Sequence, residues 1–395
     1  MNKQFLRNIA DIQTGPFGSQ LHKEDYVDIG TPIVTVEHLG NRTFTEQNLP
    51  KVSAEDKARL SKYVLAEGDI VFSRVGSVDR CSYVDTAHDG WMFSGRCLRV
   101  RPNSEIDPLF LYYFFCLEET KQFVRNIAVG ATMPSINTKL LGEVEIDLPS
   151  MEDQRKIAAT LSSLDDKIET NQKINDHLEQ QAQAYFQELF VDDADPQWTT
   201  GTISDLGQVV GGSTPSKAKP EYYTESGIAW ITPKDLSVNK SKFITHGEND
   251  ITELGLKNSS ASIMPEGTVL FSSRAPIGYI AIAAGEVTTN QGFKSVIPKA
   301  EVGTAFMYFF LKHNLPVIEG MASGSTFKEI SGSTMKNVPA VIPDTKTLSR
   351  FNDFCSPIFA QQQILEKQNQ DLALLRDALL PKLMSGEIDV SAVQL

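Results

Sequence analysis

Few side chains of this sequence have the types and spacing that a catalytic site requires. Two pairs of adjacent carboxylates, Asp165 with Asp166 and Glu118 with Glu119, fall on segments expected to be helical. Neighbouring side chains on a helix diverge, so neither pair can share a proton or a metal ion. The histidines and cysteines form no HExxH or CxxC pattern, and no GxxxxGK[ST] phosphate loop occurs. The sequence therefore predicts no catalytic, cofactor or metal site, and solvated surfaces explain the carboxylate pairs.

Composition places the chain among globular proteins. It has 395 residues, 41% apolar and 22% charged, which suggests roughly two to four domains. No apolar run is long enough to cross a membrane and the N-terminus lacks a secretory signal, so we expect a cytoplasmic protein. The net charge of -13 by itself disfavours a nucleic-acid partner, but more than half of it lies within residues 151–197. The two larger blocks are near neutral, and each could carry a basic face.

One long internal repeat organises the chain. Residues 68–74 recur as 267–274, and the aromatic residues 110–115 recur as 306–310. Residues 130–136 likewise match 324–330, in the same order. The lag is far longer than a solenoid repeat, so it indicates two copies of one domain. Short β-like runs broken by Gly and Pro predict an α+β fold for each copy, with a mostly antiparallel sheet and a few helices.

A heptad pattern follows each copy. Its first seam contains Ile157, Leu161, Leu164, Ile168, Asn171, Asn175, Leu178, Ala182, Tyr185 and Leu189. Its second seam contains Phe351, Phe354, Ile358, Gln361, Leu365, Gln368, Leu372, Leu375 and Leu379. Both seams are apolar at their ends and carry amides in the middle, as expected for helices that pair and use buried polar groups to set register.

The predicted domain order is therefore 1–150, a helical spacer 151–197, a second domain 198–345 and a second spacer 346–395. We expect the spacers to pair as an antiparallel coiled coil through Leu161, Leu164, Ile168, Leu178, Ile358, Leu365, Leu372 and Leu375. Helices of about 50 and 43 Å would then hold the two domains at opposite ends of a rod with an internal pseudo-two-fold axis. The alternative is that each helix caps its own domain.

Three segments resemble one known family. Residues 148–158 and 164–172, together with 379–388, look like the helical regions of the specificity subunits of type I restriction-modification enzymes. Residues 271–274 and 289–293 resemble that family's target recognition domains. The second spacer departs from the pattern, because residues 345–351 lack the Glu-Gln signature present at Glu152 to Gln154. The resemblance covers nearly the whole chain.

This resemblance implies a non-catalytic subunit that reads a bipartite double-stranded DNA target with an unread gap. Its partners would be two methylation subunits and, for cleavage, restriction and translocation subunits. The sequence itself lacks both the glycine-rich turn for a methyl donor and the Asn/Asp-Pro-Pro-aromatic loop that holds a target adenine. Methyl transfer would therefore belong to the partners.

Polar and glycine-rich loops supply the candidate DNA contacts, because base edges and phosphates are bound by Arg, Lys and small polar side chains. The candidates are Ser19, Arg74, Arg80, Lys139, Thr214, Lys217, Lys234, Arg274 and Lys328. The alternative for each is a solvated side chain or a structural ion pair. Arg74 and Arg274 recur at matching places, which favours a shared positioning role over base readout.

Two other functions are compatible with the same residues. A protein-only scaffold would use the helices to recruit partners and the two domains to bind peptides. A nuclease would need Mg²⁺ bound by scattered carboxylates, but no motif supports it. The resemblance favours the DNA-recognition subunit.

Overall fold

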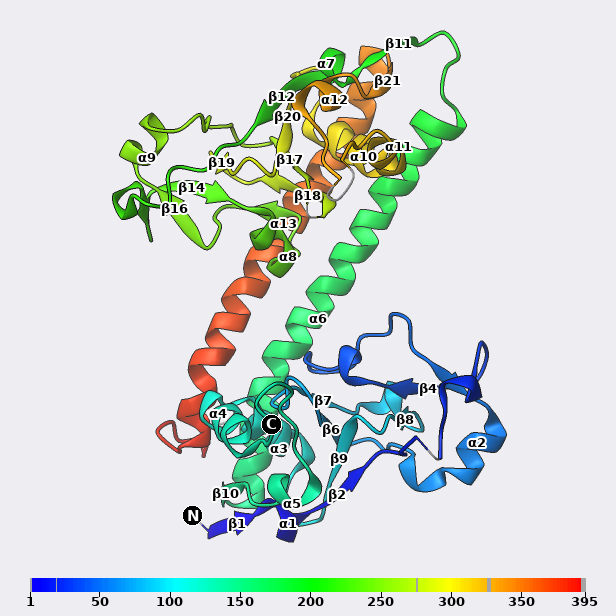
Figure 1. Ribbon diagram of the computed structural model, residues 1–395, viewed down its shortest axis with the longest axis vertical. Coiled ribbons are helices and arrows are strands. Elements are labelled where there is room, and N and C mark those ends of the chain that lie inside the picture. The colour runs from blue at the N-terminus through cyan, green and yellow to red at the C-terminus, as the bar shows by residue number, and fades with distance from the viewer. Residues whose placement is uncertain (1, 19, 275, 325–327, 392–395) are drawn as a thin grey trace. The chain divides into compact units, whose positions relative to one another are not determined.

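Two compact units make up the protein. The computed structural model describes residues 2–18, 20–274, 276–324 and 328–391. One unit contains Met1–Ile168 with Asp371–Leu395, and the other contains Glu169–Gln370. Each unit includes one of the predicted domains and a part of each long helix (Figure 1).

Two four-stranded sheets form the first unit. The antiparallel sheet has the order β2 (Ala10–Thr14), β9 (Cys97–Pro102), β6 (Ile70–Ser73) and β7 (Cys81–Tyr83). The other has the order β3 (Tyr26–Val27), β5 (Lys51–Val52), β4 (Thr31–Val34) and β8 (Met92–Phe93). An additional strand pair joins β1 (Asn2–Phe5) to β10 (Glu145–Leu148).

The second unit repeats this topology. Its antiparallel strands follow the order β12 (Gly207–Gly211), β20 (Lys294–Pro298), β17 (Val269–Ser273) and β18 (Ile277–Ala283), and β15 (Phe243–Ile244) adds a parallel edge. Its smaller sheet has the order β13 (Tyr223–Thr224), β16 (Asn249–Ile251), β14 (Ile228–Ile231) and β19 (Thr288–Thr289). Strand β11 (Thr199–Thr202) pairs with β21 (Pro339–Ile342). The predicted internal repeat and the α+β class are confirmed.

Continuous apolar strands lie between two cores in each unit. Ile70 and Phe72 of β6 enter the larger core, whereas Val71 enters the core beneath the smaller sheet. In β17, Phe271 and Leu270 divide in the same way. A strand buried on both faces needs apolar side chains at successive positions, which explains why both runs are uninterrupted.

Short helices cover the sheets. In the first unit they are α1 (Leu6–Ile9), α2 (Ala54–Arg59), α3 (Pro108–Cys116), α4 (Glu118–Ile127) and α5 (Thr138–Leu141). In the second they are α7 (Ile203–Leu206), α8 (Pro233–Val238), α9 (Glu253–Lys257), α10 (Thr304–His313), α11 (Leu315–Gly320) and α12 (Gly332–Lys336). Among the described residues, no helix has both the length and the apolar character to span a membrane.

Gln154 explains part of the Glu-Gln signature. It is 2% exposed, accepts a hydrogen bond at 2.8 Å from the backbone N–H of Asp107, and donates to the carbonyl of Pro149. Asp107 in turn caps α3 through the N–H groups of Leu109 and Phe110. The second unit places buried Leu348 at the corresponding turn of its long helix, so packing replaces these hydrogen bonds.

Two long helices, α6 (Met151–Gln187) and α13 (Thr345–Met384), pair in antiparallel order within each unit. In the first unit Arg376 donates to Asp165 at 2.6 Å. In the second unit the amide nitrogen of Asn171 donates at 2.8 Å to the side-chain oxygens of Gln368 and Asn369. Pairing through amides in the middle of the seams thus occurs as the sequence pattern indicated.

The positions predicted to face inward along the second seam are only partly correct. Leu375, predicted to pair, is 47% exposed and Phe354 is 41% exposed, whereas Gln362 is 3% exposed. Gln362 donates to the carbonyl of Asn175 and Arg376 binds Asp165, so polar side chains with partners occupy the inward positions. Among the other proposed pairing residues, Leu161, Ile358 and Leu365 are buried, and Leu164, Ile168, Leu178 and Leu372 are half-buried.

Candidate nucleic-acid interface

Three loops of the first unit meet around Arg74. Its guanidinium donates to the carbonyl of Gly95 at 3.0 Å and lies 4.9 Å from the centre of the Phe17 ring. Gly15 approaches the Ser94 carbonyl so closely that a Cβ would be 2.1 Å from that oxygen. The loops after β2 and before β9 are therefore in contact, and the Arg74 side chain holds both.

A third segment joins these loops through backbone hydrogen bonds. The N–H of Ile136 donates to the carbonyl of Arg74 at 2.9 Å, and the N–H of Gly76 donates to that of Pro134 at 2.8 Å. Gly76 has a φ of +75°, which favours glycine. Residue Lys139 follows on α5 with an exposed side chain.

These segments form the first loop cluster, which comprises residues 15–18, 74–80, 94–96 and 134–139 and contains exposed cations. Arg80 is exposed, and its Nε would be 2.7 Å from a Cβ at Gly40. Arg96 is also exposed, and its carbonyl accepts from the N–H of Arg74. Arg96 is not among the candidates drawn from the sequence, although it lies in a Ser-Gly-Arg loop. Ser19 lies outside the described residues.

The second unit has a corresponding loop cluster, comprising residues 212–217, 273–274, 290–294 and 328–330. Gly212 lies against the Asn290 carbonyl, where a Cβ would be 2.0 Å away. The Thr214 hydroxyl donates to the side-chain oxygen of Gln291, and the N–H of Ile330 donates to the Ser273 carbonyl at 3.0 Å. Gln291 is likewise not among the candidates drawn from the sequence.

Arg274 is not the backbone equivalent of Arg74. In both units an isoleucine N–H, from Ile136 or Ile330, donates to the residue that leaves the central strand, and in the second unit that residue is Ser273. The register shifts at a bulge between Phe271 and Ser273, so Arg274 stands one position further on. The predicted match between the two arginines is corrected accordingly.

Local ion pairs reduce the free positive charge in the second cluster. Arg274 lies 3.5 Å and Lys294 lies 3.9 Å from carboxylate oxygens of Glu329. Burial lowers the pKa of Lys294 despite the attraction of Glu329. Lys234, on α8 and outside this cluster, binds Glu248 at 2.5 Å, and this hydrogen bond raises the pKa of the lysine. These three cations are tied to carboxylates within the chain.

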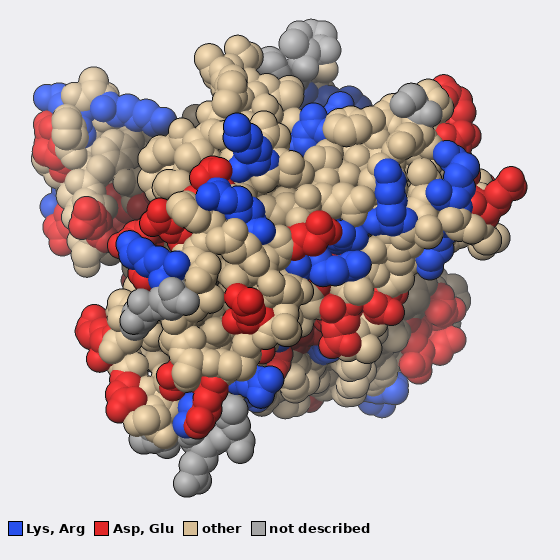
Figure 2. Space-filling view, turned by 90° about the horizontal axis from the view of Figure 1, so that it is seen from below, with Lys and Arg blue, Asp and Glu red and all other residues tan. Residues whose placement is uncertain are grey.

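Lys217 and Lys328 have exposed side chains in the second loop cluster. Figure 2 shows one face of the molecule, on which basic side chains are interspersed with acidic ones. We expect DNA affinity to depend on the exposed cations of the two loop clusters, because contacts with phosphates supply most of the affinity.

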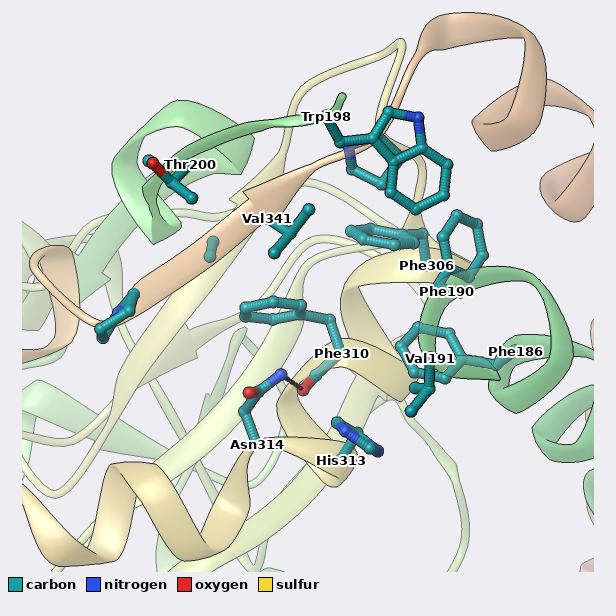
Figure 3. Close-up of a pocket in the computed structure, with 14 residues that line it drawn as sticks. Phe186, Phe190, Val191, Trp198, Thr200, Phe306, Phe310, His313, Asn314 and Val341 are labelled. Carbon is teal, nitrogen blue, oxygen red and sulfur yellow. Dashed lines mark hydrogen bonds between the residues drawn. The ribbon is translucent and has the colours of Figure 1, made fainter. Parts of the chain in front are cut away.

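A cavity in the second unit offers no catalytic constellation. Its volume is about 360 Å³, and its lining is mainly aromatic and aliphatic, including Phe190, Trp198 and Phe310 (Figure 3). His313 is the titratable residue among its lining groups. Elsewhere in the described chain, no three His, Cys, Asp or Glu residues are placed to hold a metal ion.

Two copies of one sheet domain, each with a cluster of polar loops and paired with long helices, define a tandem recognition protein. The repeated sheet domain is the common scaffold, and the loops that it carries in the two units differ in side chain and charge. Such an arrangement suits recognition of two different segments by a common framework.

Two stretches, residues 1–180 and 196–373, match the type I restriction modification DNA specificity domain. The chain therefore belongs to the family of type I restriction-modification specificity subunits. It is similar to the specificity subunit of the MjaIX enzyme of Methanocaldococcus jannaschii, with 41% identity over 191 residues, 46% of this chain and 44% of that subunit. The specificity subunit of the HindI enzyme of Haemophilus influenzae is 26% identical over 416 residues, 85% of this chain and 90% of that subunit.

A solved structure has the same fold. The S subunit of a type I restriction-modification system from M. genitalium has a TM-score of 0.61 at 18% identity, covering 97% of this chain and 95% of that one. The match to the family over both halves of the chain confirms the resemblance inferred from sequence. Specificity subunits are the non-catalytic, DNA-recognising components of their complexes. The protein-only scaffold is not favoured.

Proposed function

We propose that this chain reads a bipartite DNA target, with one half-site at each loop cluster and an unread gap between them. Residues 1–150 and 198–345 are the two target recognition domains, and residues 151–197 and 346–395 are the spacers. The spacers set the gap length and recruit two methylation subunits, to which restriction and translocation subunits are added for cleavage. The complex acts on DNA in the cytoplasm.

One observation carries this proposal: the same backbone framework presents different side chains in the two units. Both clusters are closed by an isoleucine N–H that donates to the end of the central strand. Around that shared bond, the first cluster exposes Arg80 and Arg96, whereas the second pairs Arg274 with Glu329. A common scaffold with unlike loops is what two readers of unlike sequences require.

The proposed contacts divide by their surroundings. Arg74 acts as a positioning residue because its guanidinium is engaged by Gly95 and Phe17. Arg80, Lys139, Lys217 and Lys328 are exposed and suit phosphate contacts. Thr214 and Gln291 together offer a polar pair for a base edge in the major groove. Lys234 and Arg274 reach DNA only by exchanging a carboxylate partner for a phosphate.

Methylome sequencing tests the function. The chain is expressed with a methylation subunit encoded beside it, in cells that lack other methyltransferases, and compared with cells that express the methylation subunit alone. We expect adenine methylation in a split motif that depends on this chain. Footprinting of the purified complex should show two protected patches. Methylation at one continuous motif, or methylation independent of this chain, would contradict the proposal.

A further inference from the structure

Arg42 and Lys242 occupy equivalent places in the two units. The carbonyl of Arg42 accepts from the N–H of Tyr83 at 2.7 Å, and that of Lys242 accepts from the N–H of Ile282 at 2.7 Å. Tyr83 and Ile282 hold the same position in the repeat, because each pairs with the first residue of the central strand, Ile70 or Val269. In each unit, the segment that bears the cation therefore crosses the equivalent edge of the sheet.

Each cation reaches a carboxylate on the same long helix. Arg42 forms an ion pair with Asp166 of α6. The adjacent Asp165 is 8% exposed and accepts from the Tyr113 hydroxyl of α3 and from Arg376 of α13, both at 2.6 Å. The recognition domain and both helices are thus joined at one short segment of α6.

The second unit buries its version of this contact. The Nζ of Lys242 is 2.8 Å from Glu179 of α6 and 2.9 Å from the side-chain oxygen of Gln362 of α13, and it lies 3.4 Å from the Phe359 ring centre. The Lys242 side chain is 7% exposed. The backbone N–H groups of Lys242 and Phe243 donate to the carboxylate of Glu366 at 2.8 and 3.0 Å.

These bonds join the long helices both to the short loop that carries Lys242 and to the body of the domain. Glu179 also binds Lys312 at 2.6 Å and accepts from the Tyr308 hydroxyl at 3.1 Å, so α10 shares the same carboxylate. A buried charge with several partners tolerates little displacement, because movement would leave it unpaired in a low-dielectric site. The contact therefore restrains the angle between domain and helices.

We propose that Arg42 and Lys242 are positioning residues that fix the orientation of each recognition domain on the helix pair, and thereby restrict the gap between half-sites. This inference rests on the proposed function. DNA rises about 3.4 Å per base pair, so a shift of a loop cluster by ~3 Å equals one base pair of gap. Lys242 is the stronger restraint, because the Arg42 pair is partly solvated, with Asp166 61% exposed.

The test uses Lys242→Met and Arg42→Met in the full complex with methylation subunits. Matched controls are Lys257→Met and Arg59→Met, whose surface ion pairs lie within α9 and α2. Substrates carry the half-sites found for the wild type, with gaps from two base pairs shorter to two longer. The wild type and controls should prefer one gap by at least about 100-fold. Lys242→Met should reduce that preference to about 10-fold or less, with half-site letters unchanged and Arg42→Met intermediate.

A second measurement needs no DNA. Spin labels at Asp176 of α6 and Glu225 of the second domain, both exposed, report the distance between helix and domain. Lys242→Met should broaden this distance distribution, whereas Lys257→Met should not.

In the DNA assay, Arg42→Lys should restore the gap preference that Arg42→Met loses, because lysine keeps the cation.

The two measurements separate failure of the inference from failure of the function. An unchanged gap preference together with an unchanged distance distribution in folded Lys242→Met overturns the positioning role. A changed half-site sequence also overturns it, because orientation and readout would then be inseparable. A wild-type complex without split-motif methylation refutes the proposed function. A broadened distance distribution in Lys242→Met would then still support Lys242 as a positioning residue.

Discussion

Replacing Asn171 by leucine should stabilise the helix pair. Asn171 is fully buried, its amide nitrogen donates to Gln368 and Asn369, and its Oδ1 has no hydrogen-bond partner in the described structure. Coiled-coil helices commonly accept such an amide because it selects one register at a cost in stability. The substitution therefore separates register from stability.

The contributions can be estimated from these contacts. Losing two hydrogen bonds costs about 1–3 kcal/mol, and removing the unpaired oxygen recovers about 1–3 kcal/mol. Burying a leucine side chain contributes about 1.5–3 kcal/mol. Gln368 is exposed and Asn369 half-buried, so both released oxygens can turn to water. We expect the free energy of unfolding of the second unit to rise by about 2 kcal/mol, or ~4–8 °C in Tm.

Urea and thermal unfolding followed by circular dichroism measure this change, with Gln172→Leu as the control because position 172 is exposed. The control should alter the free energy of unfolding by less than about 0.5 kcal/mol. If Asn171→Leu were destabilised by about 1 kcal/mol or more, the amide would be a net stabilising contact and the reasoning from register would be refuted.

Three further predictions concern charge and modularity. Burial lowers the pKa of Lys242 to about 8 in the folded protein, from about 10.5 in the unfolded chain. Between these two pH values only the unfolded chain holds the proton. The free energy of unfolding, relative to that of Lys242→Met, should therefore rise with pH by about 3 kcal/mol. Equilibrium unfolding of both proteins from pH 7 to 10.5 measures this change. A difference in unfolding free energy between wild type and Lys242→Met that falls with pH would contradict the prediction. Arg96→Ala should weaken DNA binding and lower the salt slope of log K by about 0.9, with Arg59→Ala unchanged, whereas an unaltered slope would remove Arg96 from the interface. Exchanging residues 1–150 for another member's domain that keeps a cation at the place of Arg42 should change one half-site and preserve the gap length in methylome data. A changed gap in that exchange would show that the spacers and this ion pair do not set the gap length.

Features that depend on local pattern were predictable from sequence. The internal repeat was visible because both copies keep apolar runs for a strand that is buried on two faces, as in residues 70–73 and 269–273. The heptad of α6 was predictable because Leu161 and Ala182 face the cores of their units at 4,3 spacing. Family resemblance then supplied the DNA-recognition function, which periodicity alone does not specify.

Tertiary structure decided the features that depend on a partner distant in sequence. Gln362 and Arg376 face inward on α13 because Asn175 and Asp165 of α6 satisfy their hydrogen bonds, so residue hydrophobicity misplaced half of that seam. A bulge shifted Arg274 by one residue from the position equivalent to Arg74, which a linear match of letters could not show. Lys242 looks like an ordinary surface lysine in sequence, yet folding buries it against Glu179, 63 residues away. Its environment exists only after sheet and helices meet, because burial and pairing are properties of the packed structure.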